Sequence, residues 1–181
     1  TDSVLPTEHA AYFEIHIEQG PILQDENLDI GVVTLVQGMR WFRIGITGQS
    51  GHTGTYPMET RRDALVAASH LIKSVQQIGL DQPLTGRATV GHIVVTPNSP
   101  NVIPGHVELM VEFRNPEVAV LDIMTEALNR TLAELEATHQ VDVTAIQELD
   151  SATINFTPDL IDIVEQAATN SGLTSKRMIS G

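Results

Sequence analysis

The spacing of apolar positions predicts strands and amphipathic helices through the middle of the chain. In residues 59–78 and 116–139, apolar side chains recur every three or four positions, which places them on one face of a helix. Elsewhere apolar and polar positions alternate with a period of two, which is typical of a strand with one buried face. Strands are predicted in this way at residues 30–36, 39–47, 88–96, 106–114 and 141–149.

From residue 39 onwards the predicted order is strand, helix, strand, strand, helix, strand. This order is typical of a split β-α-β fold, a ferredoxin-like α+β arrangement with two helices on one face of a four-stranded antiparallel sheet. Residues 30–36 are expected to form a hairpin with residues 39–47, because Gln37-Gly38 separates the two runs. The predicted module covers residues 29–150.

The segments on either side of this module, residues 1–28 and 151–181, are expected to belong to a second domain into which the module is inserted. In the second segment, Thr157 can cap a helix that has Pro158 at its first position and Gly172 just past its end. The chain is therefore expected to hold one complete domain and pieces of another.

Two histidines lie in settings that suggest a hydrolytic metal site. Residues 13–18 alternate apolar and polar side chains, so they predict a half-buried strand, and His16 lies there between two glutamates. Carboxylates near an imidazole commonly orient it for a metal, although a lone histidine on a strand is more often a hydrogen-bonded structural residue. His52 lies in residues 48–57, where glycines and a proline predict a loop that is free to carry function.

Composition narrows the classes of partner and chemistry. The chain of 181 residues has a net charge of −13 and no cluster of basic residues, which argues against nucleic acid as a partner. It has no apolar run of bilayer length and no basic-then-apolar start, so we expect no membrane contact and a cytoplasmic location. Because there are no cysteines, a metal site has to use His, Asp or Glu.

Three strings of residues occur in order and are informative together. They are His16-Ile17-Glu18-Gln19-Gly20-Pro21, Gly51-His52-Thr53-Gly54-Thr55-Tyr56-Pro57-Met58 with Arg62-Asp63-Ala64-Leu65, and Pro100-Asn101-Val102-Ile103-Pro104-Gly105 followed by Arg114. In these strings the chain resembles a family of metal-dependent amidohydrolases, which comprises N-carbamoyl-L-amino acid hydrolases, β-ureidopropionases and allantoate amidohydrolases.

The resemblance implies an α/β metallohydrolase catalytic domain with two divalent ions (Zn, Mn, Co or Ni) and an inserted lid that forms a homodimer. The implied reaction is hydrolysis of a linear amide or ureido C–N bond in an N-carbamoyl amino acid or a related ureido acid. The ending of the chain resembles the start of the family's last metal-ligand motif, before its histidine.

The resemblance also implies roles for five residues. His16 would be a metal ligand and Gln19 a substrate contact, whereas His52, Asn101 and Arg114 would reach from the lid to a substrate held by the partner subunit. The residue types suit these roles. An arginine can grip a carboxylate with two parallel hydrogen bonds, a carboxamide both donates and accepts, and an imidazole can donate to a developing oxyanion, which makes His52 the catalytic candidate.

Simpler interpretations of the same residues stay open. Arg114 could pair with Glu112, which points to the same face, and Asn101 between prolines could be a turn former. Since the chain has no His-x-Asp pair and no adjacent Glu-Glu, we expect it to be inactive by itself and to hold metal weakly or not at all. The alternatives to a carbamoylase are an allantoate amidohydrolase, a non-catalytic dimerisation module, and a dipeptidase or aminoacylase.

Overall fold

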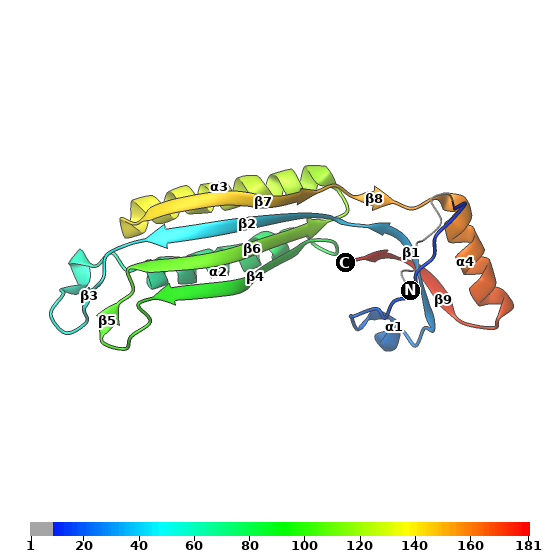
Figure 1. Cartoon of the computed structure of the whole chain (residues 1–181), viewed down its shortest axis with the longest axis horizontal. Coiled ribbons are helices and arrows are strands. Elements are labelled where there is room, and N and C mark those ends of the chain that lie inside the picture. The colour runs from blue at the N-terminus through cyan, green and yellow to red at the C-terminus, as the bar shows by residue number, and fades with distance from the viewer. Residues whose placement is uncertain (1–8) are drawn as a thin grey trace, which may run out of the picture. The chain divides into compact units, whose positions relative to one another are not determined.

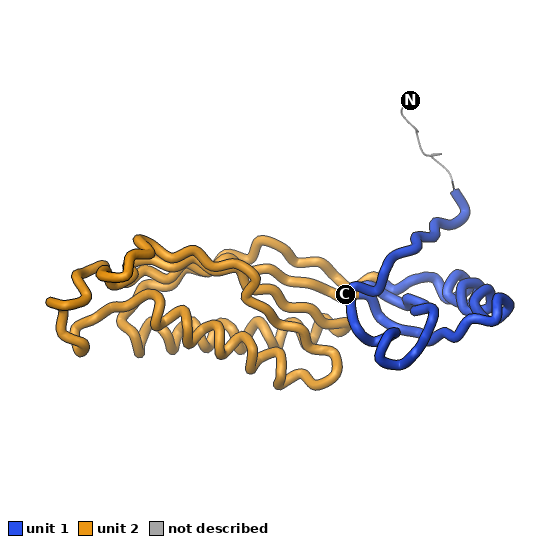
Figure 2. The backbone as a smooth tube through the Cα atoms, turned by 90° about the horizontal axis from the view of Figure 1, so that it is seen from below, with its two compact units in different colours: residues 1–36, 155–180 blue, residues 37–154, 181 orange. Residues whose placement is uncertain are grey.

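The computed structural model describes residues 9–181, which form two compact units (Figure 2). Unit 1 holds the described residues up to Val36 together with Asn155–Ser180, and unit 2 holds Gln37–Ile154 and Gly181. The first eight residues of the expected segment 1–28 lie outside the described part. No helix in the described part is both long and apolar enough to cross a bilayer.

The main element of unit 2 is a four-stranded antiparallel sheet with the strand order β4-β6-β2-β7. Its strands are β2 (Gly38–Thr47), β4 (Arg87–Thr96), β6 (His106–Asn115) and β7 (Asp142–Ser151). The central strands β2 and β6 pair without interruption from Gly38 opposite Asn115 to Thr47 opposite His106. The predicted ferredoxin-like sheet is therefore confirmed.

Two helices, α2 (Ala64–Leu80) and α3 (Val118–His139), cover one face of this sheet (Figure 1). Helix α2 begins later than predicted because the side chain of Asp63 accepts hydrogen bonds from the backbone N–H groups of Leu65 and Val66, which is the geometry of an N-cap. Residues Met58–Thr60 form a separate 3₁₀ turn, η1. The helices therefore supply the apolar cover that the alternating strands require.

The core lies between the sheet and these helices. Phe42 and Phe113 contact each other there with ring centroids 5.8 Å apart. Each large apolar side chain buried in this way contributes about 1.5–3 kcal/mol. The core gives the loops at the ends of the sheet a rigid support. Its strand and helix residues include Phe42, Ile44, Ile46, Val107, Leu109, Val111, Phe113, Leu71, Val75, Leu121, Met124 and Leu128.

The predicted hairpin of residues 30–36 with residues 39–47 is wrong. Strand β1 (Ile30–Val36) lies in unit 1, in a sheet of order β8-β1-β9 with β8 (Ile154–Asn155) and the parallel strand β9 (Ser175–Ser180). Gly38 does not form a turn but belongs to β2, where a Cβ atom would lie only 2.9 Å from the Leu121 side chain. The glycine is needed for this close packing, and the local sequence pattern cannot tell such a glycine from one that forms a turn.

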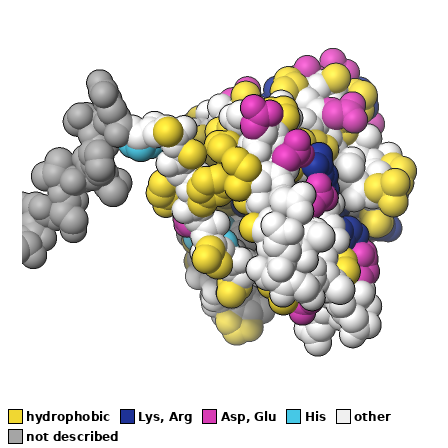
Figure 3. All heavy atoms as spheres, turned by 90° about the vertical axis from the view of Figure 1, so that its right-hand side faces the viewer, with side chains coloured by type: hydrophobic (Ala, Val, Ile, Leu, Met, Phe, Trp, Pro, Cys, Tyr) yellow, Lys and Arg dark blue, Asp and Glu magenta, His cyan; other side chains and the backbone are white. Residues whose placement is uncertain are grey.

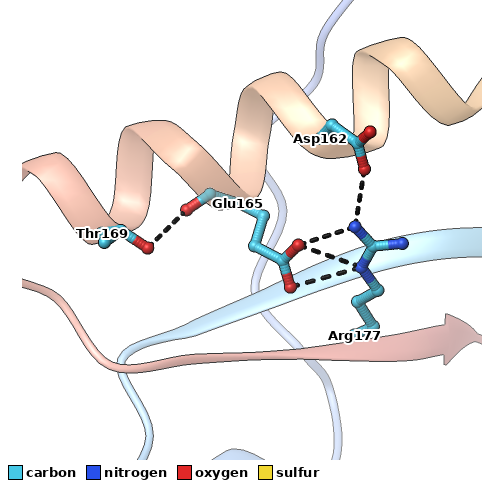
Figure 4. A network of polar contacts seen from close by, with 4 residues as sticks. All are labelled: Asp162, Glu165, Thr169 and Arg177. Carbon is cyan, nitrogen blue, oxygen red and sulfur yellow. Dashed lines mark hydrogen bonds and ion pairs between the residues drawn. The ribbon is translucent and has the colours of Figure 1, made fainter.

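In unit 1 helix α4 (Pro158–Asn170) has Pro158 at its first turn and Gly172 beyond its end with a φ of +73°, as predicted. Thr157 precedes the helix but makes no side-chain capping bond. Arg177 of β9 holds the helix against the sheet, because its Nη2 lies 2.6 Å from a carboxylate oxygen of both Asp162 and Glu165 (Figure 4).

The predicted strand at residues 13–18 is also wrong. No described segment pairs with it, and the side chains of Phe13, Ile15 and Ile17 are exposed. A strand needs a neighbour for its backbone hydrogen bonds, so alternation alone did not produce one here.

Figure 3 shows hydrophobic side chains gathered at the surface, and unit 1 exposes large apolar residues of the kind that mark a contact surface.

Candidate functional site

His52 and Asn101 are brought together by a two-stranded sheet at one end of unit 2 (Figure 1). Strands β3 (Gly51–His52) and β5 (Val102–Ile103) are antiparallel, with His52 opposite Val102. Beside this pair, the backbone N–H of Thr53 donates to the carbonyl oxygen of Asn101 over 3.1 Å. The two predicted residues therefore lie in adjoining loops.

The backbone of its own loop binds one ring nitrogen of His52 and so orients the imidazole. The backbone N–H of Gly54 donates to its Nδ1 over 3.0 Å. Because Nδ1 accepts this bond, the neutral ring carries its proton on Nε2. The side chain is exposed, so Nε2–H can donate to a ligand.

Arg61 shapes the loop that carries His52. Its guanidinium donates to the carbonyl oxygens of Thr53 and Tyr56 over 2.6 and 3.0 Å. The ring of Tyr56 lies over Gly51, where a Cβ atom would approach the ring to 2.8 Å. The glycine before His52 is therefore needed for this close approach.

Asn101 is exposed and has its amide nitrogen available. The hydroxyl of Ser99 donates to Asn101 Oδ1 over 2.9 Å, which orients the carboxamide. The neighbouring loops border an open pocket of about 430 Å³. It is lined by Thr53, Arg61, Asp63, Leu65, Val95, Asn98, Ser99, Pro100, Val102, Ile103 and Pro104.

Arg114 forms the ion pair with Glu112 that the simpler interpretation suggested. Its Nε and Nη2 donate to the two carboxylate oxygens of Glu112 over 2.6 and 3.1 Å, and the indole N–H of Trp41 donates to the same carboxylate over 2.5 Å. Burial pushes the pKa of Glu112 up, but the hydrogen bonds from Arg114 and Trp41 and the charge of Arg114 outweigh it, so this pKa lies below its ordinary value.

Arg114 does not lie near His52 and Asn101 within unit 2. It is close to the end of β6, whereas β5 and its loop precede His106 at the start of that strand. At about 3.3 Å per residue, this ten-residue strand spans roughly 30 Å. A small ureido acid is far shorter, so one copy of unit 2 cannot bring all three residues to one substrate, as the sequence-based expectation required.

Unit 1 carries the two remaining predicted residues, Gln19 and His16. Gln19 is exposed and has a positive φ of 56°. His16 Nδ1 lies 2.6 Å from the carbonyl oxygen of Ile17, so Nδ1 donates and Nε2 keeps a lone pair that suits a metal. The Glu18 carboxylate is engaged with the N–H groups of Ile22 and Leu23, at the start of the short helix α1 (Ile22–Asp25).

These residues do not make a metal centre by themselves. Within residues 9–181, no three His, Asp or Glu side chains gather as a ligand set. His16 does line a cavity of about 510 Å³ in unit 1. The other lining residues are Tyr12, Phe13, Glu14, Gly31, Val33, Val36, Phe156, Thr157, Leu160, Ile161, Val164 and Ser180.

Residues 35–140 match the family model of the peptidase dimerisation domain. The chain belongs to this family. An N-carbamoyl-L-amino-acid amidohydrolase of Rhizobium meliloti is 37% identical over 173 residues, which are 94% of this chain and 41% of that protein. The allantoate amidohydrolase of Bacillus subtilis is 36% identical over 120 residues, 66% of this chain and 29% of that protein.

A solved structure supports the same grouping. An amidase of the hydantoinase/carbamoylase family from Burkholderia vietnamiensis superposes with a TM-score of 0.88 at 46% identity, covering 92% of this chain and 40% of that one. The chain spans about two fifths of the length of the curated N-carbamoyl-L-amino-acid amidohydrolases that it matches.

Three residues that shape the site were not singled out from the sequence: Gly54, Arg61 and Trp41. Gly54 and Arg61 act through backbone groups, which leave no side-chain signature. Trp41 had a partial signal, since the alternation of residues 39–47 places it on the face away from Phe42 and Ile44, but only the strand register puts it opposite Glu112.

Proposed function

We propose that the complete enzyme containing this chain hydrolyses a linear amide or ureido C–N bond in an N-carbamoyl amino acid or a related ureido acid. The observation that carries this proposal is similarity to N-carbamoyl-L-amino-acid amidohydrolases over 94% of the chain, with His52 and Asn101 in adjoining loops. Allantoate is the second candidate substrate, because the allantoate amidohydrolase of Bacillus subtilis is 36% identical to this chain over 120 residues.

In this proposal each predicted residue has one task. His52 donates its Nε2–H to the oxygen that becomes negative when the carbonyl is attacked, and such a donor contributes about 3–4 kcal/mol. Asn101 orients the ureido group through its amide nitrogen, and Arg114 binds the substrate carboxylate. Gln19 contacts the substrate from the catalytic domain.

The complete enzyme would use two divalent ions, Zn, Mn, Co or Ni, which supply the hydroxide that attacks the carbonyl. His16 fits as one ligand through Nε2. The described residues provide no complete set of metal ligands. The roles proposed for this chain are therefore to bind and orient the substrate and to donate a hydrogen bond to its oxygen. We accordingly expect the chain by itself to be inactive.

A homodimer would reconcile the separated residues with a single substrate. Arg114 and the pair His52 and Asn101 lie towards opposite ends of β6, so a substrate that contacts both groups needs two lids. We propose that Arg114 serves the site of its own protomer and that His52 and Asn101 serve the site of the partner subunit.

The edge of the sheet formed by β4, with helix α2 beside it, is the surface best suited to this dimer. Among residues 9–181, nothing pairs with the outer side of the two edge strands of this sheet, β4 and β7. Strand β7 carries Asp142, Glu148 and Asp150 in ion pairs with Arg62, Arg43 and Arg40, and a second strand added there would desolvate these charges. Strand β4 instead exposes Ile93, and helix α2, which packs against β4, exposes Leu65 and Ile72.

The test is to assay the complete enzyme with each divalent metal against N-carbamoyl amino acids, N-carbamoyl-β-alanine, allantoate, N-acyl amino acids and dipeptides. We expect hydrolysis of one class of ureido acid, lost on chelation and restored by metal. Turnover restricted to dipeptides or N-acyl amino acids would instead assign a dipeptidase or aminoacylase. A metal-loaded dimer that hydrolyses none of the panel would be a dimerisation module without catalysis.

A further inference from the structure

Arg114, Glu112 and Trp41 form a network on the sheet face that the helices leave uncovered. Trp41 of β2 lies directly opposite Glu112 of β6, and Arg114 is the next residue of β6 on the same face. The Glu112 carboxylate accepts three hydrogen bonds, two from Arg114 and one from Trp41. The side chains of Arg114 and Glu112 are only 30% and 28% exposed, so the contacts lie in a partly desolvated place.

The hydrogen bonds occupy one particular edge of the guanidinium. Glu112 takes the side edge, formed by Nε and Nη2. The end edge, formed by Nη1 and the second hydrogen of Nη2, is left for another planar anion. Within the described residues, Glu112 is the one carboxylate that pairs with Arg114, and Arg87, opposite it on β4, donates to the carbonyls of Leu84 and Gly86 instead.

We propose that Glu112 and Trp41 are positioning residues for Arg114, which they hold so that its end edge receives the carboxylate of the substrate. This proposal rests on the proposed function, in which Arg114 binds that carboxylate. The guanidinium then loses its rotamer freedom when the protein folds rather than when substrate binds, which strengthens binding. The indole N–H of Trp41 orients the Glu112 carboxylate, which in turn orients the guanidinium of Arg114.

The test compares the complete enzyme with Glu112→Gln, Glu112→Asp and Trp41→Phe variants, using a ureido acid and its carboxamide analogue. Gln keeps the shape but has one acceptor oxygen and no charge, so it cannot take two parallel bonds from the guanidinium, and E112Q should raise the KM of the acid about tenfold with little change in kcat. E112D keeps the negative charge, so its KM for the acid should be closer to the wild-type value. W41F should raise the KM of the acid less than E112Q does. The KM of the carboxamide should stay unchanged throughout.

Arg114→Ala separates failure of this inference from failure of the proposed function. If R114A removes the preference for acid over carboxamide but E112Q does not, Arg114 binds the carboxylate and positioning by Glu112 is refuted. If R114A leaves the preference intact, the role of Arg114 in the proposed function fails as well. A lower KM of the acid in E112Q would overturn the inference, because Glu112 would then compete with the substrate.

Discussion

At the scale of single residues, one hydrogen bond decides which atom of each histidine can act. The backbone N–H of Gly54 donates to His52 Nδ1, so His52 presents a donor at Nε2. His16 donates from Nδ1 to the Ile17 carbonyl, so it presents a lone pair at Nε2. The two imidazoles therefore have opposite chemistry at the same atom, which suits a proton donor and a metal ligand respectively.

A pair of substitutions at His52 tests whether Nε2 or Nδ1 is the nitrogen that donates to the substrate. The amide nitrogen of Gln reaches the position of Nε2, whereas that of Asn reaches the position of Nδ1. His52→Gln should therefore keep more of the kcat of the complete enzyme than His52→Asn, and His52→Ala should lower kcat about 10²- to 10³-fold. Equal kcat values in H52A and the wild type, by steady-state kinetics, would contradict oxyanion donation by this residue.

At the scale of elements, a histidine pair joins the two helices of unit 2. The Nε2 of His139, in the last turn of α3, lies 3.4 Å from Nδ1 of His70 on α2, and the rings meet edge to face. Burial lowers the pKa of His139, the charge of His70 lowers it further, and Asp63 opposes both. The neutral form is thus favoured in the folded state.

This lowered pKa predicts a loss of stability in acid. An unfolded histidine binds a proton near its ordinary pKa of about 6.5, whereas folded His139 binds it only at lower pH. The unfolded state therefore holds more protons in that interval, and the free energy of unfolding falls as the pH drops below about 6.5. Thermal unfolding of His139→Gln should show a smaller difference in Tm between pH 7.5 and pH 5 than the wild type. An unchanged difference would rule out this pair as a source of the acid sensitivity.

At the scale of the whole molecule, the proposed dimer depends on which edge of the sheet pairs. The β4 edge carries Ile93, 45% exposed, and the adjacent helix α2 exposes Leu65 and Ile72, whereas Ile146, 59% exposed, lies on the β7 edge, a strand that also carries Asp142, Glu148 and Asp150. Exposure alone would favour Ile146. The ion pairs of β7 with Arg40, Arg43 and Arg62 decide against that edge, because a second strand would desolvate them.

Ile93→Lys and Ile146→Lys form a matched pair for this choice. A lysine in an interface would be desolvated without a partner, so I93K should convert the dimer to monomer at micromolar concentration, and I146K should leave it intact. Sedimentation velocity of the complete enzyme over a concentration series measures both. Dissociation by I146K and not by I93K would place the interface at β7.

Much of unit 2 could be predicted from the sequence, because its strands and helices bury one face each and so carry a local period. The core residues Leu121, Met124 and Leu128 lie where the helical spacing placed them. The start of α2 was missed by a few residues, since the predicted helix began at Glu59 and the cap is Asp63. Alternation at residues 13–18 predicted a strand that has no neighbour in the described chain.

The sequence by itself determined the order of the four long strands and two α-helices of unit 2 and the side-chain types of the five candidate residues, because period and side-chain type are local properties. Only the tertiary structure decided that β1 pairs with β9, that His52 and Asn101 share one end of unit 2, and that Arg114 lies towards the other. Pairing between distant segments leaves no local pattern, so the distances that decide which residues can meet a substrate arise only when the chain folds.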